Sequence, residues 1–370
     1  MYLVVRSIDF PKKTISLEVG RSMTFAHLEH LGNFIGCCGN LGFSNVDIRY
    51  PADMPPTWFS MLQKLERTEG FPALSLGPWA DRPPHETPGL DRFACVGRYQ
   101  DGGRSVHYGF ACRDMSAVMD DLTTTVLLIG HSIPLDEASL SYLRLCLYEL
   151  SANTVEHGTF AHEKPEIRAA LALGEDCVVV TYSDNAGAFC TLRSKRDGIA
   201  ERIKQRSKRG LGLLLLNKVT EGLSYERDSM WNHTRFIIRR KQEASCNLDR
   251  RTDMNNLSIV AMRTDSPETV VLKSSGSINS STVPQLDSSF NALLRNGQNT
   301  IVLDLSETEF ISSSGVGLLL GTVSSLRETN GDLVLMNPSK LVNDILDVLN
   351  IKMHFRIIKD VNELKVGARP

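Results

Sequence analysis

Residues 300–318 read TIVLDLSETEFISSSGVGL, and this stretch decides the fold of the last third of the chain. The aliphatic run over Thr300–Leu305 predicts a buried strand, and apolar residues at helical spacing over 315–328 predict the helix that follows it. Three consecutive serines, at 312–314, stand just before that helix, where a serine hydroxyl commonly accepts a hydrogen bond from an unpaired backbone amide. Capping accounts for one serine, so the other two are candidates for chemistry.

The alternation of strand and helix extends over residues 257–370. The predicted strands are short and rich in β-branched or aliphatic residues: Leu257–Met262, Thr269–Lys273, Thr300–Leu305, Leu333–Met336 and Phe355–Ile358. The predicted helices repeat apolar residues at helical spacing: Val283–Leu294, Gly315–Glu328 and Lys340–Leu349. Elements in this order predict a mixed sheet faced by helices.

A second group of motifs lies upstream, on a predicted long helix over Asp136–Glu156. This helix carries a leucine stripe, and Glu149, Asn153 and His157 recur along it four residues apart. The spacing places these three polar side chains on one helix face, away from the leucines. The other predicted elements of this segment are two strands and one helix: Cys177–Tyr182, Thr234–Ile238 and a helix from about Leu211.

Two stretches of small residues follow the long helix. Asp184 ends a predicted strand and is followed by Asn-Ala-Gly-Ala over 185–188, which would let a flat base approach the backbone. Glycines at 210 and 212 lead into a helix, whose free amide groups suit a phosphate. Between them, residues 193–209 hold eight basic and two acidic side chains. Together these features predict a nucleotide site.

Composition excludes several classes of protein. The 370 residues predict two or three domains, and 41 basic against 43 acidic residues give a net charge of −2, without a field typical of nucleic-acid or membrane binding. The 42% apolar and 23% charged content excludes global disorder. The eight cysteines form no C-x-x-C pair, and no apolar run approaches the roughly 18 residues of a membrane span. We therefore expect a cytoplasmic protein without direct nucleic-acid binding.

Two stretches predict the boundaries between domains. Residues 72–89 are rich in proline, and residues 239–256 are polar without apolar periodicity, so both read as linkers. The chain is then a multi-domain α/β (α+β) protein with segments 1–100, 105–240 and 257–370. The first is a small α/β unit of unpredicted role, whose strand and helix order is similar to that of the last segment. Its predicted elements are Thr14–Val19, Phe25–Ile35, Val46–Tyr50 and Thr57–Leu65.

The segment 105–240 resembles the ATP-binding domain of the family that includes histidine kinases and gyrase, most closely its anti-sigma-factor serine kinases. The resemblance rests on Glu149-Leu-Ser-Ala-Asn153, on Asp184 and on the glycine box over 209–213. It implies a Bergerat-type α/β sandwich that binds ATP and Mg²⁺, with Glu149 as catalytic base and Asn153 as the metal ligand. The residues implied to contact the cofactor are Asn153, Asp184, Gly187, Arg209, Gly210, Gly212 and Thr234.

The motif at residues 184–188, called the second box below, departs from the family pattern D-x-G-x-G. Ala186 and Ala188 stand where the family has glycines. If either position required a positive φ, alanine would cost on the order of 1 kcal/mol. The backbone of these two residues therefore decides how well the box is preserved.

The segment 257–370 resembles the STAS domain of anti-sigma-factor antagonists. Asp304-Leu305-Ser306, the run over 310–317, and Gly276-Ser-Ile-Asn279 match its motifs. The resemblance implies that Ser313 is the phosphorylated serine, with Ser312 and Ser314 as alternates. Ser312 and Asn279 stand where the family has acidic residues. Phosphate at this helix start would add about two negative charges to a docking surface.

These resemblances predict a bacterial-type partner-switching regulator that binds Mg·ATP and phosphorylates serine on a STAS domain, its own or a partner's. The alternative is a non-catalytic antagonist or scaffold with a degenerate nucleotide pocket. Whether the chain is an enzyme, a serine/threonine protein kinase, stays open at this point. The implied partners are STAS-domain, anti-sigma or sigma-factor-like proteins, and a homodimer is a further alternative.

Overall fold

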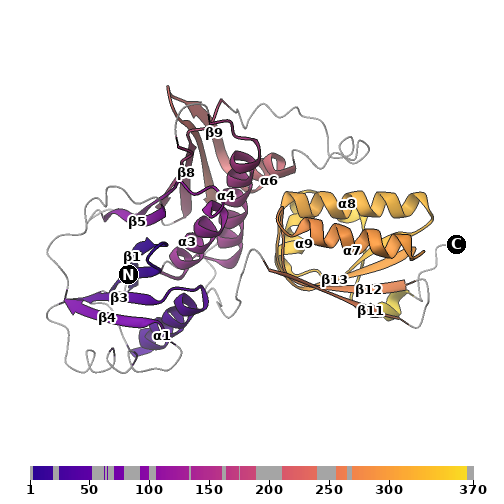
Figure 1. The fold of residues 1–370 in the computed structure, drawn as a ribbon, viewed down its shortest axis with the longest axis horizontal. Helices are drawn as coiled ribbons and strands as arrows, with labels where there is room; N and C mark the ends of the chain where they lie inside the picture. Colours follow the sequence, from indigo (N-terminus) through magenta and orange to yellow (C-terminus); the bar gives the residue numbers. More distant parts are fainter. Residues whose placement is uncertain are drawn as a thin grey trace. The chain divides into compact units, whose positions relative to one another are not determined.

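The computed structural model describes residues 3–19, 25–51, 62, 65, 71–78, 92–99, 106–132, 135–160, 164–174, 176–188, 211–239, 256–264 and 269–364. The chain divides into two compact units (Figure 1). The first contains residues 1–189 and 220–251, and the second contains residues 190–219 and 252–370.

The first unit is built on a ten-stranded sheet. In spatial order its strands are β4 (Ala73–Pro78), β3 (Asn45–Tyr50), β2 (Thr14–Val19), β1 (Leu3–Asp9), β5 (Arg92–Tyr99), β6 (Val106–Cys112), β7 (Ile167–Leu173), β8 (Cys177–Asp184), β10 (Asn232–Arg239) and β9 (Glu221–Arg227). The expected strands at 14–19, 46–50, 177–182 and 234–238 are confirmed within a few residues.

The N-terminal strands do not form a separate sheet. Strand β1 pairs with β2 on one side and with β5 on the other, and β5 pairs with β6 across the boundary expected near residue 100. Helix α1 (Phe25–Asn40) connects β2 to β3, and these two strands are parallel. Buried Ile15, Val46 and Phe34 belong to the core of this part of the unit.

One predicted linker is partly wrong. Residues 73–78 form β4, although the proline-rich stretch 72–89 was expected to be free of regular structure. Pro72 precedes the strand and Pro78 is its last residue, so neither proline removes a donor from the strand interior. Residues 79–89 lie outside the described residues.

Two helices, α3 (Val118–Ser132) and α4 (Glu137–His157), pack against each other and against the first unit's sheet. Helix α4 is the long helix that the leucine stripe predicts, and it contacts β8 and β10. Its first turn is capped by Asp136, whose Oδ1 accepts a hydrogen bond from the amide of Ser139 at 2.9 Å. Helix α4, which carries the predicted polar residues, therefore packs against β8, at whose end the second box begins, and against β10.

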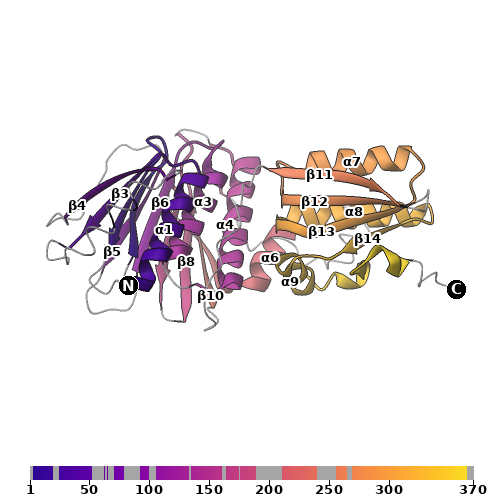
Figure 2. The same ribbon diagram turned by 90° about the horizontal axis from the view of Figure 1, so that it is seen from below.

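The second unit contains a five-stranded sheet in the order of the chain (Figure 2). Strand β11 (Leu257–Arg263) is antiparallel to β12 (Thr269–Ile278), and β12, β13 (Thr300–Ile311), β14 (Asp332–Met336) and β15 (Arg356–Ile358) are parallel. Its helices are α6 (Leu211–Val219), α7 (Val283–Arg295), α8 (Ser313–Glu328) and α9 (Lys340–Val348), with short 3₁₀ turns at Lys352–His354 and Val361–Leu364. The mixed sheet and the helices expected over 257–370 are confirmed.

Candidate functional site

The first part of the candidate site lies on α4. Glu149 is 4% exposed, and Asn153, one turn later, is half-buried. The Nδ2 atom of Asn153 is buried and has no hydrogen-bond partner among the described residues. A buried amide that lacks a partner costs about 1–3 kcal/mol, so this atom fits a site that a ligand completes.

The second part is Asp184, at the end of β8. Its Oδ1 accepts hydrogen bonds from Asn232 Nδ2 at 2.8 Å and from the amide of Ala186 at 3.1 Å. Its Oδ2 has, within the described parts of the chain, only a 3.5 Å contact with the hydroxyl of Thr154, and that hydroxyl also donates to the carbonyl of Leu150 at 3.1 Å. Asp184 therefore keeps one oxygen available for a further donor.

The contact between Thr154 and Asp184 joins the two predicted boxes. Thr154 lies four residues after Leu150, on the side of the leucine stripe, and directly follows Asn153, so the end of β8 contacts α4 next to its polar face. The amide of Gly187 also donates to the carbonyl of Thr159, just after α4, at 2.7 Å. Tertiary contacts thus join the two elements that carry the residues expected to bind a base and a metal ion.

The residue opposite Asp184 is Asn232. Thr234, which the resemblance implies beside the base, lies two residues further along β10. In the antiparallel pairing of β8 and β10, Asn232 faces Asp184, whereas buried Thr234 faces Tyr182. Asn232 is 2% exposed, and its Oδ1 accepts from the hydroxyl of Tyr225 at 2.6 Å and from Arg227 at 2.5 Å. Sequence reasoning missed Asn232 because the strand register decides which residue stands there.

The alanines of the second box do not strain its backbone. Among the described residues, positive φ angles occur at four positions other than glycine: Lys13, Asn330, Asn337 and Asn350. Ala186 and Ala188 are described and are not among them, so the penalty of about 1 kcal/mol for alanine at positive φ does not apply. The substitutions leave the course of the box compatible with a bound base.

Burial raises the pKa of the Asp184 carboxyl above its ordinary value. The hydrogen bonds from Asn232, from the amide of Ala186 and from Thr154 oppose this effect, because they stabilise the ionised form. Asn232 therefore both orients the carboxylate and helps to keep it charged.

No group of three or more His, Cys, Asp or Glu side chains that could hold a metal ion occurs in the described residues. Mg²⁺ is usually held by one or two protein oxygens together with water and substrate phosphates. The Asn153 side chain can contribute to such a site, because its amide oxygen can coordinate an ion, while its buried Nδ2, which lacks a partner in the described structure, can donate to a phosphate oxygen.

The remaining predicted cofactor residues are placed as follows. Gly212 is buried in α6, in the second unit. Arg209, Gly210 and the basic stretch 193–209 lie outside the described residues.

The serine cluster lies at the start of α8. Ser312 is 1% exposed and is the N-cap, since its hydroxyl accepts from the amide of Gly315 at 3.4 Å. Ser313 is half-buried at the first helical position, and the hydroxyl of Ser314 bonds to that of Ser312 at 2.7 Å. Of the three serines, Ser312 is the least accessible to a phosphate donor, because its hydroxyl is buried within the cap.

Asn279, which replaces a family acid, has a structural role in the loop before α7. It is 1% exposed, and its Oδ1 accepts from the amides of Ser281 at 3.0 Å and Thr282 at 3.2 Å. An amide oxygen serves these bonds as a carboxylate would, so this substitution leaves the loop intact.

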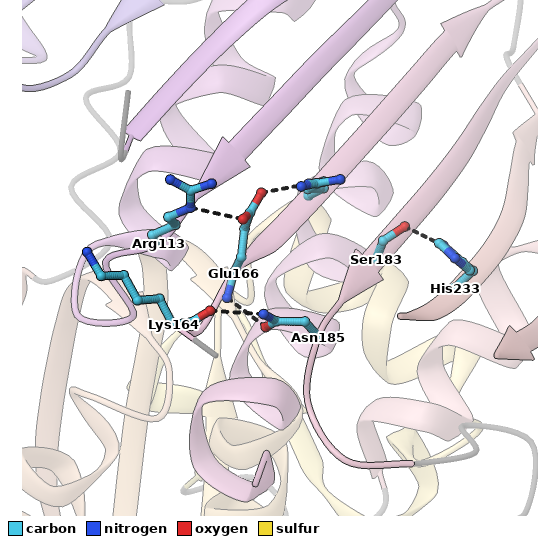
Figure 3. A network of polar contacts seen from close by, with 7 residues as sticks. Arg113, Lys164, Glu166, Ser183, Asn185 and His233 are labelled. Atoms are coloured by element: carbon cyan, nitrogen blue, oxygen red, sulfur yellow. Dashed lines mark hydrogen bonds and ion pairs between the residues drawn. The ribbon is translucent and has the colours of Figure 1, made fainter. Parts of the chain in front are cut away.

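A polar network on β7 anchors the second box (Figure 3). Asn185 accepts from the amide of Glu166 at 2.8 Å and donates to the carbonyl of Lys164 at 2.9 Å. Glu166 pairs with Arg113 and Arg168, and although burial alone would raise its pKa, these two partners lower it. The residue after Asp184 is therefore held by bonds that no local sequence pattern indicated.

Comparison with known proteins gives matches to two families. Family models match residues 115–238 as a histidine kinase-like ATPase domain and residues 261–364 as a STAS domain. An anti-sigma F factor antagonist of Lysinibacillus sphaericus is 34% identical over 79 residues, which are 21% of this chain and 68% of that protein. The chain belongs to the STAS-domain family. In this chain, the STAS domain follows a histidine kinase-like ATPase domain.

Other relatives match over the STAS-sized part alone. The putative anti-sigma factor antagonist BtrV of Bordetella bronchiseptica is 32% identical over 73 residues, 20% of this chain and 63% of that protein. A solved anti-sigma factor antagonist from Mycobacterium paratuberculosis aligns at 17% identity with 32% of this chain and 99% of its own, at a TM-score of 0.28. The Bacillus protein SpoIIAA in its phosphorylated form aligns at 23% identity with 30% of this chain and 98% of its own, at a TM-score of 0.26.

Among the described residues, no helix has the length and apolar character that crossing a membrane would require.

Proposed function

We propose that this chain is a partner-switching regulator whose ATPase domain binds Mg·ATP and phosphorylates a serine of a STAS domain. The observation that carries the proposal is the contact between Thr154 and Asp184, which joins α4, directly after Asn153, to the end of β8. Within the described residues, the buried Nδ2 of Asn153 has no hydrogen-bond partner. Relatives of the STAS domain are anti-sigma factor antagonists, which supports anti-sigma factors as the class of partner.

The family resemblance and the contacts of Asp184 support a role for each residue. Asp184 Oδ2 accepts the exocyclic amino group of the base, while Asn232 holds Oδ1. Asn153 holds the metal ion, and Glu149 takes the proton from the serine hydroxyl. Bound ATP supplies the phosphoryl group that the serine oxygen accepts, and positive charge near this group stabilises the transfer. We assign Ser313 as the acceptor in this chain.

Incubation of the full chain with γ-labelled Mg·ATP, followed by peptide mapping, tests this function. We expect label on Ser313, loss of that label in Ser313→Ala, and retention in Ser314→Ala. Mixing an Asn153→Ala chain with a Ser313→Ala chain then separates the two routes, because only transfer between molecules labels the first chain. No label on either chain or on an added STAS-domain partner would contradict the kinase.

A second candidate function is a non-catalytic antagonist. The feature that favours it is the second box, where Ala186 and Ala188 stand in place of the glycines of the ATPase family. Calorimetry distinguishes the two functions. Mg²⁺-dependent binding of ATP supports the enzyme, whereas absence of binding supports the antagonist.

ATP affinity is expected to fall as the pH is lowered through the raised pKa of Asp184. Recognition of a base amino group requires the ionised carboxylate, so the loss begins at a higher pH than for an ordinary aspartate. Asn232→Ala removes a bond that lowers this pKa and should move the loss to higher pH still. Calorimetric titrations between about pH 5 and pH 8 measure the effect. The Asp184→Asn variant is the control, because any pH dependence of its ATP affinity comes from other groups. If the ATP affinity of the wild type had the same pH dependence as that of this variant, the prediction would be refuted.

A further inference from the structure

The two sheets have four edge strands, and three of them carry features that discourage further pairing. Strand β4 ends in Gly77-Pro78, and β15 has three residues. Strand β9 carries charged residues, and its pairing with β10 has a register shift. Short length, proline, charge and irregular register are the usual means by which proteins protect a sheet edge.

Strand β11 has none of these features. It is seven residues long, pairs with β12 without a register shift, and contains no charged residue before Arg263 at its end. Val260 and Met262 lie on the same face of the strand and are 52% and 42% exposed. Gln285 Nε2 donates to the outward carbonyl of Leu257 at 3.1 Å, at the start of the strand. In the described structure the edge from Ile259 onward carries no such contact, and an apolar edge of this kind is typical of a strand that has a partner.

The backbone direction of β11 shows which groups face its outer edge. The carbonyl of Asn256 accepts from the amide of Ser277 at 3.0 Å, so residue 256 directs its polar backbone groups toward β12. In an antiparallel pair these directions alternate along the strand. The amides and carbonyls of Ile259 and Ala261 therefore point outward, and those of Val260 point inward.

We propose that the outer edge of β11 pairs antiparallel with β11 of a second copy of this chain, with Val260 on the two-fold axis. In this register Ile259 of each copy faces Ala261 of the other, and their outward groups form both hydrogen bonds of each pair. Val260 faces its own counterpart and Met262 faces Ser258 of the other copy. Arg263 faces Leu257, so no like charges meet across the interface.

The first unit contains a precedent for this pairing. Strands β1, β2 and β3 have the same relative directions as β11, β12 and β13, and in both cases a helix connects the two parallel strands. The outer edge of β1 is covered by an antiparallel strand, β5, through residues 7–9. The same position in the same strand arrangement of this chain therefore accepts an antiparallel partner.

Cysteine cross-linking tests the register. Directly opposed Cβ atoms in an antiparallel pair are about 4.5–5.5 Å apart, which is close enough for a disulfide after a small adjustment. In the full chain, Val260→Cys should give a covalent dimer under mild oxidation. Met262→Cys is the matched control, because the two copies of residue 262 stand four residues, about 13 Å, apart along the strands. The wild type, which has native cysteines, gives the background.

Sedimentation measurements over a range of concentrations test the dimer itself. We expect a dimer of the wild-type chain, and at least a 10-fold weaker association for Val260→Lys, which places two cations on the axis. Ala261→Pro should have a similar effect, because it removes an amide that faces only the outer edge. Met353→Lys is the control for the added charge, since Met353 is 74% exposed but lies outside β11.

Three results would overturn the proposal. The wild-type chain could be monomeric at all concentrations, as it would be if a strand from residues 240–255 of the same chain covered this edge. The dimer could persist unchanged in Val260→Lys and Ala261→Pro, with both variants folded by circular dichroism. Met262→Cys could cross-link as readily as Val260→Cys.

Discussion

Replacing Asn153 with alanine is expected to lower the rate of phosphate transfer by about 100-fold or more, which is the usual effect of removing one group that stabilises developing charge. Asn153 is the proposed metal ligand, and its buried Nδ2 lacks a partner within the described residues. The same variant should keep or slightly increase the free energy of unfolding, because it removes a polar atom that has no bond in the free protein. Transfer is measured with labelled Mg·ATP and stability by urea denaturation.

The control is Asn45→Ala, the same substitution at an exposed position on β3. It should leave both the transfer rate and the free energy of unfolding near their wild-type values. A large loss of stability in Asn153→Ala would show that this side chain is structural. Equal transfer rates in the two variants would remove Asn153 from the site.

Replacing Gly276 with alanine is expected to destabilise the STAS domain by about 3 kcal/mol or more, the range of a strained backbone combined with a clash. Gly276 has a φ of +101°, which side chains rarely adopt, and an added Cβ would lie 2.2 Å from the carbonyl oxygen of Asn256. Because that oxygen belongs to the backbone that leads into β11, the clash cannot be relieved by rotating a side chain. Hydrogen exchange followed by mass spectrometry, in urea, reports the unfolding of residues 257–364 separately from that of the first unit.

Two other glycines separate the effect of backbone strain from that of the steric clash. Gly297 has a φ of +78° with nothing within 4 Å of an added Cβ, so Gly297→Ala should show the backbone strain alone, about 1 kcal/mol. Gly321 lies in α8 with open space around it, so Gly321→Ala should be neutral or stabilising by up to about 1 kcal/mol. A Gly276→Ala variant no weaker than Gly297→Ala would show that the close approach to Asn256 is not maintained in solution.

The elements that local patterns mark most strongly could be predicted from the sequence. The leucine stripe indicated α4, and the strands and helices of the STAS domain appear at the expected places within a few residues. Strands β1 and β5 were not predicted, and β4 was expected to be a linker. Strands β1 and β5 pair with each other inside the ten-stranded sheet, so their stability depends on strands that are distant in the chain, and their own sequences carry a weak signal.

The candidate site could be predicted in part. Asp184 and Asn153 were identified from motifs, and the structure joins their elements at Thr154. Asn232, which faces Asp184, was not predicted; Thr234, the residue expected beside the base, lies two positions away on the same face of β10. Alternation alone cannot distinguish these two positions, because they lie on the same face of the strand.

The sequence by itself determined the features that depend on neighbours along the chain. These are the start of α8 at its serine cap, the polar face of α4, and the glycine near the end of β12, Gly276. The tertiary structure alone decided that Asn232 holds Asp184, that Asn185 is tied to β7, and that the N-terminal strands join the ATPase sheet through β1 and β5. The physical reason is that pairing between distant strands depends on register and on packing across the sheet, and both are settled only when the whole sheet assembles.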